Sequence, residues 1–462
     1  MISRPSLGRS AQLALRRQRQ GQPSNRRGLA AVASGTFNYE TGEGAGVKFA
    51  SRDLTGPTTT VAVVAKAGTR YQVLPGFSDG LEKFAFKSTT KRSALRITRE
   101  TELLGGQLSA YHSRENLVIG AKFLREDLPY FTELLGEIIT KTRFTSHEWQ
   151  EDVQPFIHLA QKAVLGNVTQ LAINSVHGVA FHRGLGEPLH PTSSTPLTKY
   201  LSAERIQAYS QAAYAKPNIA VVANGASHAD LSKWVGEFFG DVKSTPPSNV
   251  PAINTTPSKY YGGEERIAHD SGNTMILAFP GSSSFTGSSY KPELAVLAAL
   301  LGGESSIKWS PGFSLLSRNT AAHPHAHIST SHAAYSDAGL LCISITGNAV
   351  HIKEASKEVV KTLKSVAAGE ISNEDLKKAI ASAKFKALES GESLATGIEL
   401  TGAGLIHGGK AFQIDEVGKG IDGVSGDQLK KAAKSLLDGK SSVSSVGDLF
   451  ILPFAEEIGL HV

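Results

Sequence analysis

The sequence predicts an α+β protein with two homologous domains, each an antiparallel-rich sheet packed by helices. Three observations support this prediction. A chain of 462 residues exceeds the size of one ordinary hydrophobic core, so two or more domains are expected. Segments with strand-like and helix-like periodicity follow each other in the same order in the two halves of the chain. The hydrophobic fraction of 40% and the charged fraction of 19% are typical of a globular protein.

The N-terminal segment differs in composition from the rest of the chain. Residues 1–39 contain seven arginines, no lysine and no acidic residue. An arginine-rich, serine-containing segment without acids is typical of a mitochondrial transit peptide, which we assign to residues 1–36. A basic arm that binds nucleic acid or a membrane is the alternative. Without these seven charges the formal net charge falls from +6 to −1, which argues against nucleic acid as a partner.

The chain has neither a membrane-spanning run nor a disulfide framework. Its longest apolar runs, such as residues 294–303, fall short of the about 18–20 residues that cross a bilayer. An association with a membrane would therefore depend on other chains. The single cysteine, Cys342, excludes an internal disulfide and a multi-cysteine metal site, and its apolar, strand-like surroundings predict a buried thiol.

The first domain is predicted over residues 37–240. A proline in the first turn of the amphipathic helix 125–142 is tolerated there. Helix 144–163 begins with a Ser/Thr cap followed by acidic residues, which favour a helix N-terminus. The predicted elements, in order, are a β-rich run 58–70, a helical region, strands within 107–124, helix 125–142, helix 144–163 and a strand with its turn at 218–227.

The second domain is predicted over residues 264–462, after a linker at 241–263. The linker is rich in Pro, Ser, Thr and Asn and lacks hydrophobic periodicity. Residues 144–149 correspond to 371–376, and Gly225 corresponds to Gly447, at offsets of about 225 residues. The predicted elements are strand 273–283, helix 288–303, a hairpin within 325–347, helix 352–369, helix 371–390 and strand 441–453.

A series of short motifs occupies residues 67–116. In order, they are Gly68-Thr69-Arg70, Asp79-x-x-Glu82-Lys83, Phe86-Lys87-Ser88-Thr89, Glu102-x-x-Gly105-Gly106 and Ser113-Arg114-Glu115. This region resembles the signature of the insulinase-like (inverzincin, M16) metallopeptidase family, which pairs two such domains on one chain. The family pattern reads Gly-Ser-Arg, His-x-x-Glu-His, Phe-Lys-Gly-Thr, Glu-x-x-Gly-Gly and Ser/Thr-Arg-Glu. The resemblance covers essentially the whole chain after the predicted transit peptide, and it implies two domains of the insulinase/processing-peptidase type.

The catalytic part of this signature is degenerate. A zinc peptidase of this kind needs two histidines one helical turn apart, a glutamate that takes a proton from zinc-bound water, and a downstream glutamate. Asp79 and Lys83 stand at the two histidine positions, and an ammonium group repels a cation. The downstream ligand is expected around position 159, but residues 153–186 contain no carboxylate, and His158 is the only candidate near that position.

We therefore predict no catalytic residue, no metal ligand and no cofactor in this chain. Asp79, Glu82 and Lys83 are the degenerate zinc-site positions. Glu82 is expected to remain as a helix-surface or ion-pair residue. Its candidate partners are Lys83, Arg92 and Arg114.

A few members of the family are non-catalytic mitochondrial subunits. One kind is a core subunit of respiratory complex III, and another is the alpha subunit of the mitochondrial processing peptidase, whose glycine-rich loop handles presequences. Bulky residues make a loop less free to move than a run of glycines. The corresponding segment here, 300–320, contains Gly302, Gly303 and Gly312 together with Ile307, Trp309 and Phe313. This interrupted loop favours the complex III subunit, and presequence binding is the alternative.

The resemblance also implies partners and a location. The chain is expected to be a structural subunit on the matrix side of the mitochondrial inner membrane, attached peripherally. The implied partners are a core protein 1-like chain, cytochrome b, cytochrome c1, the Rieske protein and the small subunits of complex III. No haem or iron–sulfur cluster is expected in the chain itself.

A histidine-rich segment begins just before the predicted hairpin and continues into its first strand. His323, His325 and His327 alternate, so they are predicted to lie on one strand face, with His332 further along. Clustered histidines can bind a transition metal. Ring nitrogens spaced by two along a strand are about 6–7 Å apart, which makes a tight tripod difficult. A strand that faces solvent or another subunit is the favoured interpretation.

Overall fold

The computed structural model describes residues 38–54, 56–192, 196–247, 253, 255–304 and 312–462. The predicted transit peptide lies outside these residues, as do Ile307 and Trp309 of the interrupted loop. Contacts group residues Thr36–Val462 into one unit, and the description below concerns that unit.

Two sheets with matching topology form the framework. The first has the order β1-β2-β6-β3-β5-β4, and the second has the order β7-β11-β8-β10-β9. In each sheet one pair is parallel (β2 with β6, β7 with β11), and the other pairs are antiparallel. The strands are β1 Glu40–Gly44, β2 Val47–Arg52, β3 Thr58–Ala65, β4 Gln107–His112, β5 Leu117–Leu124, β6 Ile219–Asn224, β7 Gly263–Ala268, β8 Asn273–Pro280, β9 Ala326–Ala334, β10 Gly339–Gly347 and β11 Ser442–Gly447. The predicted duplication of an antiparallel-rich α+β domain is confirmed.

Several helices of the first half begin where the sequence places a capping residue or a proline. Pro129 occupies the first turn of α4, as predicted, and the Ser93 side chain caps α3 by accepting from the backbone N–H of Arg96. The helices are α2 Phe77–Phe84, α3 Ala94–Leu103, α4 Leu128–Lys141, α5 Ser146–Glu148, α6 Gln154–Leu165, α7 Val168–Phe181, α8 Leu197–Tyr200, α9 Ala203–Ala213 and α10 His228–Phe238, with a π-helical turn at Trp149–Val153 and short 3₁₀ turns η1 Thr69–Tyr71, η2 Arg125–Asp127, η4 Gly184–Gly186 and η5 Lys216–Asn218.

Helices of the second half follow the same rules. Ser372 caps α14 by accepting from the backbone N–H of Asp375, and Ser425 forms a capping box with Gln428 at the start of α17. The helices are α11 Pro292–Leu301, α12 Leu315–Asn319, α13 Ala349–Ala368, α14 Asn373–Glu392, α15 Leu394–His407, α16 Ile414–Asp422 and α17 Gly426–Asp438, with a 3₁₀ turn η6 Glu456–Ile458.

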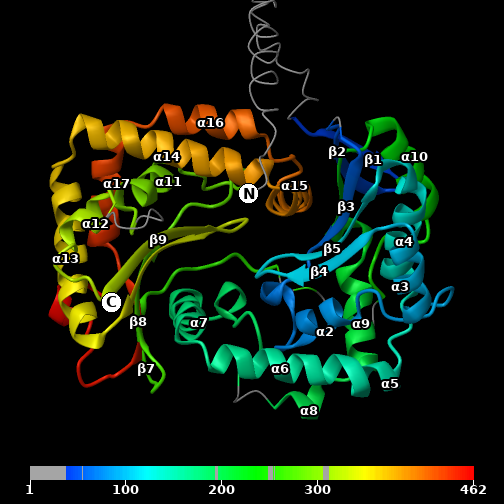
Figure 1. Ribbon diagram of the computed structural model, residues 1–462, viewed down its shortest axis with the longest axis horizontal. Coiled ribbons are helices and arrows are strands. Elements are labelled where there is room, and N and C mark those ends of the chain that lie inside the picture. Colours follow the sequence, from blue (N-terminus) through cyan, green and yellow to red (C-terminus); the bar gives the residue numbers. More distant parts are fainter. Residues whose placement is uncertain (1–37, 55, 193–195, 248–252, 254, 305–311) are drawn as a thin grey trace, which may run out of the picture. The chain divides into compact units, whose positions relative to one another are not determined.

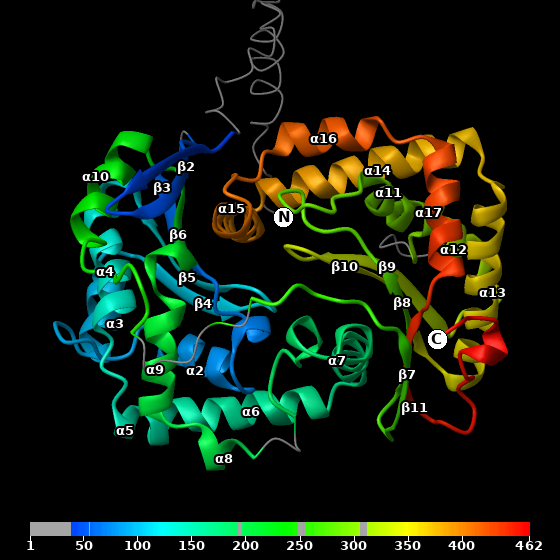
Figure 2. The ribbon, with the colours of Figure 1, turned by 180° about the vertical axis from the view of Figure 1, so that it is seen from behind.

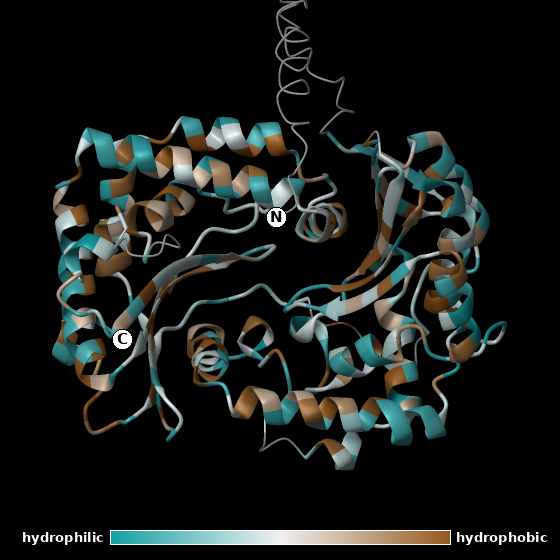
Figure 3. Cartoon of the chain, viewed as in Figure 1, coloured by the Kyte–Doolittle hydropathy of each residue, from teal (hydrophilic) through white to brown (hydrophobic). Residues whose placement is uncertain are grey.

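Each sheet buries one face against helices of its own half. In Figure 1, α3, α4 and α10 lie beside the first sheet, and α11, α13 and α17 lie beside the second. The first core contains Val61 and Val63 of β3 with Phe131 and Leu135 of α4, all fully or almost fully buried. Figure 3 shows hydrophobic residues along the strands and along the helices that cover them. Burial of these apolar side chains is the main stabilising contribution in both halves.

The other face of each sheet is covered by a helix from the opposite half. Helix α7 packs on β7, β8 and β11, and helix α15 packs on β2, β3 and β6. Figures 1 and 2 both show α7 beside the second sheet and α15 beside the first. Val176 of α7 contacts a cluster that includes Ile276 and Leu340, while Leu405 of α15 belongs to a cluster with Val64. Residue number therefore separates the two sheets and the two main cores, whereas each of these two smaller clusters contains residues of both halves.

The end of the predicted linker is tied to the second sheet. The Ser258 backbone N–H donates to Asp337 Oδ2 at 2.8 Å, and Ser442 Oγ donates to the Tyr260 hydroxyl at 2.9 Å. Strand β7 already begins at Gly263.

The predicted strand of alternating histidines is wrong. β9 begins at Ala326, so His323 and His325 precede it and only His327 and His332 lie in the strand. The backbone N–H of Ala326 donates to the His323 carbonyl, which turns the chain before the strand starts. The ring centroids of His323 and His325 lie 6.1 and 5.1 Å from the ring centroid of His351 in α13.

The single cysteine is placed as predicted. Cys342 lies in β10 and is a buried free thiol. Burial raises the pKa of the thiol to about 12, so it stays protonated and inert at neutral pH.

Candidate functional site

Helix α2 carries the degenerate zinc-site positions. Gly76 precedes the helix with φ +97°, and the Gln72 side chain accepts from the Ser78 backbone N–H at 3.2 Å. A Cβ added at Gly80 would lie 2.6 Å from Ile206, so the helix packs closely on α9. Asp79 and Glu82 are three residues apart and share one helix face, which is directed at the end of β4.

Two histidines from outside the helix meet these carboxylates. His190, in the loop after η4, donates from Nδ1 to Asp79 Oδ1 at 2.7 Å. His112, the last residue of β4, donates from Nδ1 to Glu82 Oε2 at 2.5 Å. Its Nε2 lies 2.9 Å from the Leu189 carbonyl oxygen and 4.0 Å from Asp79 Oδ2. The two imidazole rings stand edge to face, with centroids 5.2 Å apart.

Glu82 is neutralised by two cations. Its Oε1 accepts from Lys83 Nζ at 2.5 Å, while Oε2 is bound to His112. Burial by itself raises the pKa of this carboxyl, but the hydrogen bonds and charges of His112 and Lys83 outweigh burial and lower the pKa to about 2. Burial likewise opposes protonation of His112, yet the hydrogen bond to Glu82 and the charges of Asp79 and Glu82 raise its pKa. The two nitrogens of His112 then donate to Glu82 and Leu189.

This geometry does not fit the zinc peptidase mechanism of the family. That mechanism needs a glutamate free to take a proton from a zinc-bound water. Glu82 is bound to His112 and Lys83 instead, and an ammonium stands at the second ligand position. His158 lies on α6, where its Nδ1 is 3.4 Å from Gln161 Oε1, and it does not join the group formed by Asp79, His112 and His190.

The sequence anticipated one of the partners of Glu82 and missed another. Of the three cations considered, Lys83 pairs with Glu82, whereas Arg92 and Arg114 bind elsewhere. His112 was not anticipated, although it directly precedes the Ser113-Arg114-Glu115 motif. His190 lies in the segment 184–191, which has no recognisable ligand spacing. Spacing rules apply within one helix or strand, so they cannot identify side chains from different elements.

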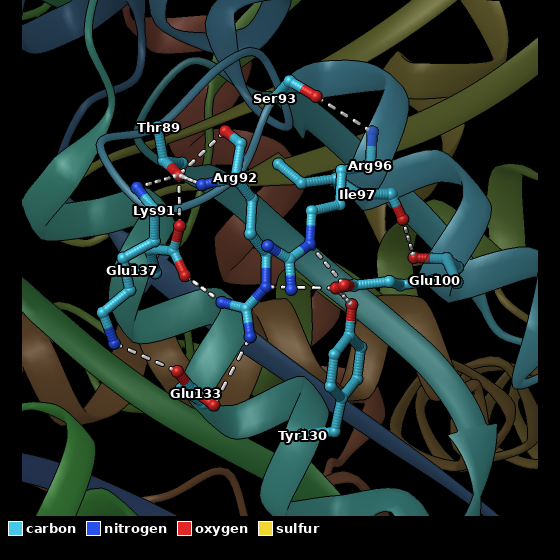
Figure 4. A network of polar contacts seen from close by, with 11 residues as sticks. Thr89, Lys91, Arg92, Ser93, Arg96, Ile97, Glu100, Tyr130, Glu133 and Glu137 are labelled. Carbon is cyan, nitrogen blue, oxygen red and sulfur yellow. Dashed lines mark hydrogen bonds and ion pairs between the residues drawn. The ribbon is translucent and has the colours of Figure 1, made fainter.

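Arg92 belongs to a separate charged network, shown in Figure 4. Its guanidinium pairs with Glu137 and Glu133 of α4. It also pairs with Glu100 of α3, where Arg92 Nε lies 3.1 Å from Glu100 Oε2. The Thr89 hydroxyl donates to the same Glu137. This network connects the Phe86–Thr89 motif to α4, so the motif contributes to the packing of the first half.

Arg70 and Glu115, from two further motifs, join the first half to the β9–β10 turn. Arg70 donates to Glu115 Oε1 at 2.6 Å and to both carboxylate oxygens of Asp337 at 2.7 Å. Glu115 also accepts from the Ser336 backbone N–H and hydroxyl at 2.8 and 2.6 Å. A Cβ at Gly68 would lie 2.4 Å from the Glu115 carbonyl carbon, so glycine allows this close approach.

A cavity of about 260 Å³ lies between the halves, next to this ionic group. Two acidic residues, Glu115 and Glu399, line this cavity. Glu399 accepts hydrogen bonds from the Ser113 hydroxyl at 2.6 Å and from the Asn116 amide at 3.2 Å. Both carboxylates are thus held by groups of this chain.

Comparison with known proteins identifies the family. Residues 48–193 match the model described as insulinase (peptidase family M16), and residues 200–383 match the one described as peptidase M16 inactive domain. The chain is 54% identical over the full length of both chains to "Cytochrome b-c1 complex subunit 2, mitochondrial" of Neurospora crassa. It is 34% identical to the Yarrowia lipolytica protein of that name over 94% of this chain and 99% of the relative. The human protein of that name is 27% identical over 89% and 90% of the two chains. The chain therefore belongs to the family of mitochondrial cytochrome b-c1 complex subunit 2 proteins, whose two domains are of the insulinase (M16) type.

Proposed function

We propose that this chain is subunit 2 of a mitochondrial cytochrome b-c1 complex (ubiquinol–cytochrome c reductase, respiratory complex III), and that it is a non-catalytic, structural core subunit. The observation that carries the proposal is the full-length match at 54% identity to a protein of that name. Of the two kinds of non-catalytic subunit considered from the sequence, this is the core subunit of complex III, and within that complex it is core protein 2.

The site geometry supports a non-catalytic role. Three polar or charged residues left from the peptidase signature have structural partners: Glu82 with His112, Arg70 with Glu115 and Asp337, and Thr89 with Glu137. A catalytic glutamate must be free to exchange a proton, and a pKa of about 2 makes Glu82 a poor base. The chain accordingly acts in the complex through its surfaces, and we propose that no residue of it is catalytic.

The proposal extends to partners and location. The partners are core protein 1, cytochrome b, cytochrome c1, the Rieske protein and small subunits, and the chain is attached peripherally on the matrix side of the inner membrane. No haem or iron–sulfur cluster is held by this chain. Among the described residues, no helix has the length and apolarity needed to cross a membrane. Large apolar side chains exposed on the described surface offer interface area; they include Phe156, Leu159, Phe385, Phe450 and Phe454.

The alternative is a presequence-binding alpha subunit of the mitochondrial processing peptidase. Basic amphipathic peptides would need free acidic groups in the cavity between the halves. Glu115 there is paired with Arg70, and Glu399 is bound by Ser113 and Asn116. The alternative is therefore not favoured.

A native gel of mitochondrial membranes solubilised in mild detergent tests the proposal. The gel is probed for this chain and stained for haem. We expect the chain to migrate with haem in one large complex. Migration as a small, soluble, haem-free heterodimer would instead support the processing-peptidase alternative.

A further inference from the structure

Three side chains with metal-binding atoms converge beside α2. Asp79 of α2, His112 at the end of β4 and His190 in the loop after η4 each offer one ligand atom, and these atoms lie within 4.8 Å of one another. Asp79 and His112 are buried, and His190 is half-buried. Three ligands from three separate elements can surround an ion, whereas neighbours on one helix cover only one side.

One oxygen in this group has no hydrogen-bond partner. Asp79 is 2% exposed, and its Oδ2 accepts no hydrogen bond from any described residue. The closest approach of His112 Nε2 to this oxygen is 4.0 Å, which is too long for a hydrogen bond. Buried carboxylate oxygens are almost always paired or bound to a metal, so this oxygen indicates a missing ligand.

The surroundings resemble the outer shell of a metal site. Metal-binding histidines usually donate their second N–H to a carboxylate, which fixes the ring and the tautomer. Glu82 holds His112 Nδ1–H in this way at 2.5 Å, which leaves Nε2 on the side of Asp79. Lys83 does not enter the group, because its ammonium is bound to Glu82 Oε1. When His112 binds a metal as neutral imidazole, the carboxylates Asp79 and Glu82 carry one more charge than Lys83 neutralises.

We propose that Asp79, His112 and His190 bind one divalent transition-metal ion, and that zinc(II) is the ion their chemistry fits best. Two imidazole nitrogens and one carboxylate oxygen are common zinc ligands. On binding, the metal replaces the contact of His112 Nε2 with the Leu189 carbonyl, and any proton on that nitrogen passes to solvent. This site replaces the sequence-based prediction that the chain has no metal ligand, and it is independent of the proposed function.

The proposed site differs from the zinc site of the peptidases in its ligands and in its use. Only position 79 is shared, and the other ligands come from β4 and from the loop after η4. Because Glu82 orients His112, it is not available to activate a water. The metal therefore fixes the 184–191 loop to α2 and does not restore hydrolysis.

Metal titration of the full-length chain tests the proposal. The purified chain is stripped with EDTA, then titrated with zinc chloride by calorimetry and with cobalt chloride by visible absorption. We expect one equivalent of zinc and cobalt d–d bands typical of mixed nitrogen and oxygen ligands. Asp79→Asn and His190→Ala are expected to weaken binding at least tenfold and to remove the cobalt bands. The supporting change Glu82→Gln is expected to weaken binding by about tenfold.

A matched control addresses surface histidines. The triple variant His323→Ala, His325→Ala and His327→Ala should bind zinc as the unmodified chain does. Loss of binding in the triple variant but not in Asp79→Asn would mean adventitious binding, and it would overturn the proposal. Absence of stoichiometric binding in the unmodified chain would also overturn it. Circular dichroism without metal confirms that each variant is folded, and Glu82→Gln serves as the second test if a ligand variant is not.

Discussion

The two halves share a strand order but bury different polar side chains. In the described part of the first half, the buried charged residues and histidines are Arg52, Arg70, Asp79, His112, Arg114, Glu115, Glu137, Glu148 and His177. In the described part of the second half, the buried polar residues are all serines and threonines: Thr274, Ser282, Ser283, Ser317, Thr320, Ser356, Thr362, Thr401, Ser441, Ser442, Ser444 and Ser445. A buried hydroxyl needs one local hydrogen bond, whereas a buried charge needs a specific partner. One topology can therefore be stabilised either by charge pairs or by neutral packing.

The largest expected effect comes from breaking a charge pair of the first half. Arg70→Ala leaves Glu115 buried without its cation, and we expect the free energy of unfolding to fall by about 3–5 kcal/mol. Urea unfolding at neutral pH measures this change. The control in the second half is Arg318→Ala, which removes an ion pair between an exposed arginine and the half-buried Asp375 and should cost about 0–1 kcal/mol. Equal losses for the two variants would contradict the contrast between the halves.

The exchanged helices provide the next test. Leu405 of α15 is 3% exposed and packs on the first sheet, so Leu405→Ala should lower the free energy of unfolding by about 2–4 kcal/mol. If α15 stabilises both halves together, urea unfolding should remain one cooperative transition. Leu103→Ala, at a leucine of α3 that is 85% exposed, is the control and should change stability by less than about 0.5 kcal/mol. Two separate unfolding transitions in the unmodified chain would contradict this view.

A pH dependence is expected where α7 docks on the second sheet. His177 is buried, with Nε2 2.8 Å from the Tyr335 hydroxyl, and burial together with the charge of Arg114 lowers its pKa to about 3. The unfolded chain takes up this proton near pH 6.5, while the folded chain does so only near pH 3. Stability should therefore fall as pH falls through this window, by up to about 3 kcal/mol between about pH 6.5 and pH 4.

Unfolding midpoints between pH 7 and pH 4 measure this effect. In His177→Gln the acid-induced loss should be smaller by that amount. His147→Gln, at an exposed histidine, should retain the acid-induced loss of the unmodified chain. If His177→Gln and the unmodified chain lose stability equally, His177 is not the responsible group.

The smallest expected effect tests the equivalence of the halves. Gly225 follows β6 with φ +85°, and Gly447 is the last residue of β11 with φ +132°. An added Cβ would lie 2.6 Å from the Thr58 carbonyl oxygen in the first case and 2.7 Å from the Gly272 carbonyl oxygen in the second. Alanine at either position should cost a similar amount, about 1–3 kcal/mol. Gly105→Ala is the control for backbone strain alone, because Gly105 has φ +67° and open space around it. Clearly unequal losses of stability for Gly225→Ala and Gly447→Ala would contradict the correspondence of the two positions.

The sequence by itself determined the features that depend on local spacing. Hydrophobic periodicity identified part of the strands and helices of both halves, among them β3, α4, β8 and α13, because neighbours on one face recur every two or every 3.6 residues. Other elements, such as β1, β2, α7 and α15, were not identified from the sequence. Motif spacing showed that the histidines of the zinc signature are replaced by Asp79 and Lys83. The correspondence of Gly225 and Gly447 was also predicted from order along the chain, and both glycines have a positive φ at or next to the end of a strand.

Only the tertiary structure decided which distant residues meet. Glu82 contacts His112 across 30 residues, and Asp79 contacts His190 across 111 residues, distances over which periodicity carries no information. The exchange of α7 and α15 between the sheets is of the same kind, because each helix has an apolar face that its local sequence could direct to either sheet. The histidine strand was wrong because a backbone turn at His323 ended the alternation before β9 began. Side-chain period and spacing act within one element, whereas the partners of a buried charge or an apolar face are chosen by how whole elements pack.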